Sequence, residues 1–155
     1  MDLDLELISI ADRPALLALS TMEYLAVTKA ALTDLGYKVH AAGNHEDFVL
    51  RFGRVAYQVL VVEELFAATH SAENLTLQHL QLMSMSHRRS TVSILIGSYC
   101  QTLNPMQAFQ HSVHAVINPT DLPQIKPVIQ QAVANHEGFL KVYRDIELRL
   151  ANGKI

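Results

Sequence analysis

Short apolar runs recur along the chain and predict the strands of a buried sheet. Four runs of aliphatic residues are bounded by polar or turn residues, at 15–19, 58–62, 92–96 and 115–117. Runs of this length are typical of strands that are covered on both faces, as in a parallel sheet. The segment 37–41 alternates apolar and polar residues, which predicts a fifth strand at or near a sheet edge.

The segments between these runs carry apolar residues at helical spacing. They predict helices over 21–35, 44–52, 74–87 and 105–112, and a long helix from Pro123 onward. Ser20 or Thr21 is the expected cap of the first helix. Strict alternation of strands and helices implies right-handed crossovers. We therefore predict an α/β fold of the (βα)5 type: a five-stranded parallel sheet with helices on both faces and an extended C-terminal helix.

Composition and charge narrow the class of protein. Half of the 155 residues are apolar and 17% are charged, which suits one globular domain. The formal charge of −3 argues against nucleic-acid binding. A single Cys100 excludes an internal disulfide, and no apolar run has the length of a membrane span or a secretory signal. We expect a cytoplasmic protein that binds neither nucleic acid nor membrane.

The predicted strand ends carry the residues of a family resemblance. Gly36 and Tyr37 lead into the second strand, the run 57–63 ends in Glu63, and Asn118-Pro119 follows the fifth strand. Together with the spacing of the elements, these features resemble the receiver domain of bacterial two-component response regulators. The resemblance covers residues 13–135 and implies a flavodoxin-like fold and a place in signal transduction or a phosphorelay.

The remainder of the chain divides into two short segments. Residues 1–12 form a predicted N-terminal arm, and residues 136–155 extend the last helix as a possible dimerisation segment.

The resemblance also implies a phosphorylation site whose parts can be checked. Receivers phosphorylate an Asp at the end of the third strand. Two acidic residues after the first strand hold Mg²⁺, and a hydroxyl residue after the fourth strand binds the phosphoryl group. After the fifth strand, a Lys neutralises the charge of that group. The Lys precedes a Pro, and the bond before this Pro is cis in receivers. The site works by positioning the transferring phosphoryl group and by neutralising its charge.

This chain departs from the pattern at most of these positions. The acceptor position holds Glu63, which is followed by Glu64, and the positions of the acidic pair hold Ser20 and Thr21. The hydroxyl position holds Gly97, with Ser98 one residue later, and the lysine position before Pro119 holds Asn118. Without the acids and the lysine, charge on a transferring phosphoryl group stays uncompensated. We predict a degenerate, or pseudo-, receiver that has no catalytic residue, metal or cofactor and is not phosphorylated on an aspartate.

Glu63 has two interpretations at this stage. Its carboxylate, one methylene longer than that of Asp, could mimic a permanently charged acceptor. Alternatively it is a partly solvated acid without a special role, since one carboxylate carries one charge where a phosphate carries about two.

The last predicted helix carries a heptad seam. Apolar or semi-polar residues alternate at spacings of three and four: Leu122, Ile125, Ile129, Ala132, His136, Phe139, Tyr143, Ile146 and Leu150. Burying each large side chain contributes about 1.5–3 kcal/mol, so the part beyond the domain should find a partner. We predict a homodimer with an interface at His136, Phe139, Tyr143, Ile146 and Leu150. The alternative is packing against Leu3, Leu5 and Leu7 of the arm in one chain.

Two functions from different classes remain. The first is a non-catalytic receiver-like signalling module that contacts a second copy and an unidentified signalling protein. The alternative is a flavodoxin-like enzyme or small-ligand-binding domain. Its crevice would lie at the carboxyl ends of the strands, near Ser20, Thr21, Glu63, Glu64, Ser98 and Asn118.

Two smaller groups of charged or titratable residues are expected to have structural roles or none. His111 and His114 are expected to be surface histidines, because no carboxylate or cysteine nearby in sequence completes a metal site. His87-Arg88-Arg89 is expected to cap the preceding helix.

Overall fold

The predicted sheet is present in the computed structural model, which describes residues 13–70 and 73–153. Its strands are β1 (Pro14–Ala18), β2 (Lys38–Ala41), β3 (Val59–Glu63), β4 (Val92–Ile96) and β5 (Ala115–Ile117). They lie in the order β2-β1-β3-β4-β5, and every neighbouring pair is parallel. This order is that of flavodoxin-like folds.

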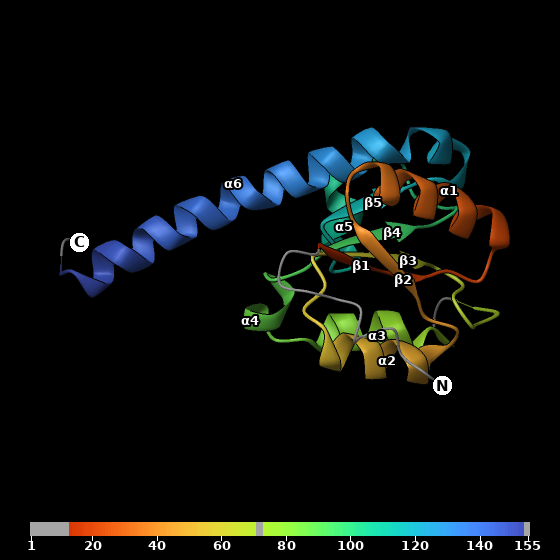
Figure 1. Ribbon diagram of the computed structural model, residues 1–155, viewed down its shortest axis with the longest axis horizontal. Coiled ribbons are helices and arrows are strands. Elements are labelled where there is room, and N and C mark those ends of the chain that lie inside the picture. Colours follow the sequence, from red (N-terminus) through yellow and green to blue (C-terminus); the bar gives the residue numbers. More distant parts are fainter. Residues whose placement is uncertain (1–12, 71–72, 154–155) are drawn as a thin grey trace.

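Helices cover both faces of the sheet (Figure 1). On one face lie α1 (Met22–Asp34) and the long α6 (Ile125–Ala151). The other face is covered by α2 (His45–Arg54), α3 (Leu75–Leu82) and α5 (Pro105–Gln110), with the short α4 (Met85–Arg88) leading into β4. All residues of β1, β3 and β4 are buried, which is why these strands read as unbroken apolar runs.

Two predicted helices differ most from the structure. The segment 74–87 is not one helix: α3 ends at Leu82 and α4 begins at Met85. The last helix begins at Ile125 rather than Pro123, because residues Pro119–Gln124 form a 3₁₀ turn that contains Pro123. Such tight turns are common at helix N-termini.

The last helix is a single unbroken element of 27 residues. Its first half packs on the sheet through Ile125, Ile129, Ala132 and other buried residues. Figure 1 shows the second half projecting away from the body of the domain. None of the helices in the described part of the chain is long and apolar enough to cross a membrane. The predicted arm, with Leu3, Leu5 and Leu7, lies outside the described residues.

Two histidines link the packed half of α6 to the sheet. The rings of His114 and His136 are 4.5 Å apart and nearly perpendicular. Nε2 of His136 donates to the carbonyl of Arg89, and Nδ1 of His114 accepts from the backbone N–H of Ser93 at 3.0 Å. Burial, followed by the charges of His136 and Arg88, lowers the pKa of His114 to about 4. The His114 ring is therefore neutral at pH 7, although part of the residue is exposed to solvent.

This lowered pKa predicts a loss of stability in acid. The unfolded chain binds a proton at His114 near pH 6.5, while the folded chain resists it until about pH 4. Unfolding should therefore become easier as the pH falls through this window, and the effect should level off below it. Chemical unfolding of H114Q should show a weaker pH dependence between these limits, whereas H87Q, at an exposed histidine, should keep that of the parent.

Candidate functional site

The candidate site lies where β1, β3, β4 and β5 end, at the carboxyl edge of the sheet. The register of the parallel strands aligns Ala18 with Val62 and Glu63 with Ile96. The loops after these strands therefore start at the same level. The structure brings Ser20, Thr21 and Glu63 together here through direct hydrogen bonds.

Glu63 is the centre of the site. Its Oε1 accepts hydrogen bonds from the backbone N–H groups of Ser20 at 3.0 Å and Thr21 at 2.9 Å. Its Oε2 accepts from the hydroxyl of Thr21 at 2.9 Å. The residue is only 8% exposed. Thr21 is the N-cap position of α1, so the carboxylate also lies where the helix dipole favours a negative charge.

These bonds change the role expected for both partners. The sequence predicted Ser20 or Thr21 as the cap of the first helix. The hydroxyl of Thr21 makes no capping bond, because it donates to Glu63 instead. Glu63 is not the partly solvated acid of the second interpretation, since it is buried and three internal donors use its two oxygens. The resemblance implies a metal ion between the loop after β1 and the end of β3. Here the carboxylate itself joins them.

Neighbouring polar groups fix the two loops further. The hydroxyl of Ser20 accepts from the backbone N–H of Ala67 at 2.8 Å. The side-chain amide of Asn74, which is fully buried, donates to the carbonyls of Glu63 and Glu64 at 3.0 and 2.9 Å. The sequence marked Asn74 only as a helix start. Its second role could not be predicted, because it depends on where the loop after β3 returns.

The hydroxyl position after β4 is closed by its neighbours. A Cβ atom at Gly97 would lie 2.8 Å from Sγ of Cys100 and 3.1 Å from Oε2 of Glu64. A Ser or Thr there would require Cys100 to move. Burial, and then the charge of Glu64, raises the pKa of the Cys100 thiol, which keeps it protonated and unreactive at neutral pH.

Asn118 stands where receivers have their lysine, and it links loops. Its Nδ2 donates to the carbonyls of Ser98 at 3.2 Å and Cys100 at 2.9 Å. Its Oδ1 accepts from the backbone N–H of Thr120 at 3.0 Å. No peptide bond within residues 13–70 and 73–153 is cis, so the bond before Pro119 differs from the cis bond that the resemblance implies.

The assembled site holds acids without a cation. Glu63 and Glu64 lie beside neutral groups, and the lysine position is occupied by an amide. Across the part of the chain that the structure describes, no group of three or more His, Cys, Asp or Glu residues is placed to hold a metal ion. Such a site can fix loops, but it supplies no positive charge for a transferring phosphoryl group.

Comparisons with known proteins find similarity in the fold alone. No family model matches the sequence, and no curated protein matches it. The chain is similar to a CheY-like response regulator receiver domain protein from Methanospirillum hungatei, with a TM-score of 0.61 at 16% identity over 83% of this chain and 98% of that one. A response regulator from Thermotoga maritima gives 0.60 at 12% identity over 79% and 98%.

A third similar structure is longer than this chain. NtrX from Brucella abortus gives a TM-score of 0.66 at 14% identity, over 93% of this chain and 30% of that one. These similarities confirm the predicted receiver fold.

The bonds of Glu63 predict a measurable contribution to stability. E63Q removes the charge from three internal hydrogen bonds, and losses of this kind cost about 1–3 kcal/mol. Urea unfolding should show a decrease in the free energy of unfolding within that range. E147Q, on the exposed part of α6, is the matched control and should stay close to the parent. An E63Q protein as stable as the parent would show that these bonds do not hold the site together.

Proposed function

We propose that this protein is a non-catalytic signalling module with a receiver fold. It acts in the cytoplasm through protein–protein contacts and not through phosphorylation of an aspartate. The observation that carries the proposal is the set of hydrogen bonds from Ser20 and Thr21 to Glu63. These bonds form an internal contact at the place where a receiver has its metal ion and its phosphate acceptor.

The remaining positions support the same conclusion. Gly97 has no room for a side chain unless Cys100 moves, and Asn118 uses its amide to hold backbone carbonyls. Restoring a receiver site would thus require several coordinated changes. In receivers, phosphorylation biases a two-state surface. In this protein, the surface is set by the fold or by a bound partner.

Exposed apolar residues support a role in protein contacts. On α5 and the loop before it, Tyr99 is 88%, Met106 65% and Phe109 80% exposed. On the projecting half of α6, Phe139 is 57% and Ile146 46% exposed. Met106 and Phe109 share one face of α5 by their spacing, as Phe139 and Ile146 do on α6. Exposed apolar faces of this kind are typical of interaction surfaces.

We propose that a second copy covers the outer stripe of α6, defined as Phe139, Tyr143, Ile146 and Leu150. The stripe continues the heptad spacing of the packed half of the helix. Tyr143 is partly engaged within the chain, since its hydroxyl accepts from Arg89 at 2.9 Å. His136, at the base of the stripe, is buried against the same chain, so the exposed interface begins at Phe139.

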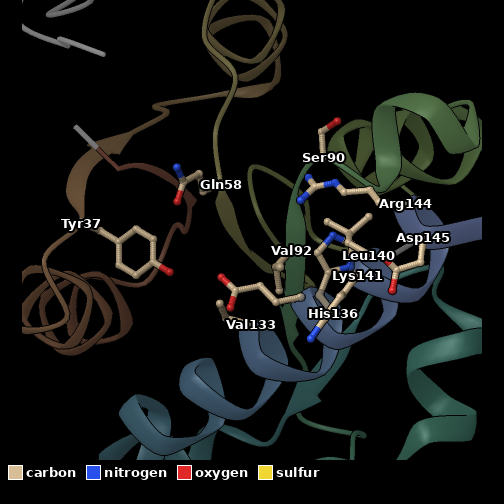
Figure 2. A pocket seen from close by; sticks show the side chains of 11 residues that line it. Tyr37, Gln58, Ser90, Val92, Val133, His136, Leu140, Lys141, Arg144 and Asp145 are labelled. Atoms are coloured by element: carbon tan, nitrogen blue, oxygen red, sulfur yellow. The ribbon is translucent and has the colours of Figure 1, made fainter. Parts of the chain in front are cut away.

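The alternative, a ligand site at the carboxyl edge, has less support. The cavities of about 510, 300 and 590 Å³ are lined by residues outside the candidate site. The first of them lies on one flank of α6, where side chains of the helix face Tyr37 and Gln58 across the cavity (Figure 2). A metabolite that co-purifies with the protein and shifts the resonances of Ser98 and Asn118 would favour the alternative.

The first prediction concerns phosphorylation. Incubation with acetyl phosphate and Mg²⁺ should leave the mass of the intact protein unchanged, because the site offers no aspartate, metal ligands or lysine. Intact-protein mass spectrometry at neutral pH measures this directly, with an active receiver treated in parallel as a control. A labile phosphoryl adduct on Glu63 or Glu64 would contradict the proposal.

The second prediction concerns assembly. Light scattering of the full chain should give twice the mass of one chain, because exposing the outer stripe to water is unfavourable. The double variant F139S/I146S should be a monomer. L148S is the matched control: Leu148 is 62% exposed but lies off the stripe, so this variant should remain a dimer. A parent protein that is monomeric at all concentrations tested would exclude the dimer.

A further inference from the structure

A small basic pocket lies on the flank of α6, away from the candidate site. It has a volume of about 300 Å³, at the lower end of the range for small-molecule sites. Three parts of the fold form it: the end of α4 with the turn that follows it, the residues before β5, and α6. The side chains that the argument uses are those of Arg88, Arg89, Val113, His114, Asn135 and Phe139.

The charge of this pocket is one-sided. Arg88 and Arg89 both line it, and none of the described residues that line it is acidic. The neighbouring cavity of about 510 Å³ differs, since it combines Lys141 and Arg144 with Glu137 and Asp145. An excess of positive charge without internal carboxylates is the environment that an anion requires.

Both guanidinium groups are held in place by contacts within the protein. Arg88 donates to the carbonyl of Ser112 at 2.8 Å. Arg89 donates to the hydroxyl of Tyr143 at 2.9 Å, and its guanidinium lies 4.7 Å from the centre of that ring. These contacts orient the two groups. Because a guanidinium has five N–H donors, each group also keeps donors for a ligand. Pre-oriented donors lower the entropic cost of binding.

The pocket also offers neutral donors and an apolar wall. Because Nδ1 of His114 accepts from the backbone of Ser93, the hydrogen of the neutral ring is on Nε2, which is a donor. Asn135 adds an exposed amide. Val113 and Phe139 line the same space, and 57% of Phe139 is open to solvent.

We propose that this pocket binds a small organic anion, in which one phosphate or carboxylate group is attached to an apolar body. The oxyanion would pair with Arg88 and Arg89, as planar guanidinium groups favour. The body would lie against Val113 and the part of Phe139 that lines the pocket, which leaves the rest of that side chain to the second copy. Because its lining comes from α6 and from the turns before β4 and β5, a ligand there would bridge the base of the projecting helix to the sheet. The proposal does not rest on the degenerate receiver site.

The test is a titration of the full ¹⁵N-labelled chain at pH 7 and constant ionic strength. The probes are phenyl phosphate, benzoate, phenol and inorganic phosphate. Phenyl phosphate or benzoate should give saturable shifts at Arg88, His114 and Phe139. Phenol and inorganic phosphate should bind at least tenfold more weakly, because each lacks one half of the proposed chemistry. The tighter of the first two probes identifies the preferred oxyanion.

Variants locate the site. R88Q and R89Q should each lower the affinity at least tenfold, while R149Q, which removes an exposed arginine near the end of α6, should leave it unchanged. Since Arg89 also contacts Tyr143, N135D provides an independent variant. It places a carboxylate in the pocket at an exposed position of similar size, and it should also weaken binding at least tenfold.

Three results would overturn the proposal: no saturable shifts with either aromatic anion, equal affinity for phenol, or an equal loss of affinity in R149Q. None of them would alter the expected outcome with acetyl phosphate, so failure here is distinguishable from failure of the proposed function.

Discussion

The carboxylate of Glu63 joins two neighbouring internal strands of this fold at the carboxyl edge of the sheet. β1 and β3 are neighbours in the sheet, and the loop after β1 turns directly into α1. Glu63 reaches from the end of β3 to the first amides of that loop. Hydrogen bonds to a charged group contribute about 1.5–3 kcal/mol to stability, so this contact is a substantial constraint on the loop. Through the hydroxyl of Ser20, which accepts from the backbone N–H of Ala67, the loop after β1 also contacts the loop after β3.

The departures from a receiver site are consistent with one another. Where a receiver uses a cation to connect groups, this chain uses direct hydrogen bonds. Glu63 binds amides, Asn118 binds carbonyls, and Cys100 fills the space above Gly97. Each of these groups makes its contacts within the protein. A module of the proposed kind would act through its exposed surfaces.

Those surfaces lie on α5 and along α6, away from the candidate site. The last helix packs its first half on the sheet and carries its apolar stripe beyond it (Figure 1). The basic pocket lies at the junction of the two halves, where His136 and Phe139 both line it. One helix thus connects the sheet, a ligand-sized pocket and an exposed apolar stripe.

The sequence predicted the strands well, because buried parallel strands are continuous apolar runs whose limits are visible. It also placed Ser20, Thr21 and Glu63 in one site, since parallel strands end at the same edge. It did not predict the break between α3 and α4, and it could not predict the second role of Asn74, which depends on where the loop after β3 returns. The meeting of Arg88, His114 and His136 was equally hidden, because it depends on how α6 crosses the sheet.

Hydrogen exchange at the amides of Ser20 and Thr21 tests the central contact most directly. If Glu63 holds these amides, they should exchange slowly in the parent protein at neutral pH. In E63Q they should exchange about tenfold faster or more, as the loss of a charged acceptor implies. The exchange rates of the buried amides of β4 should be the same in both proteins. Equal, rapid exchange of Ser20 and Thr21 in both proteins would contradict the account.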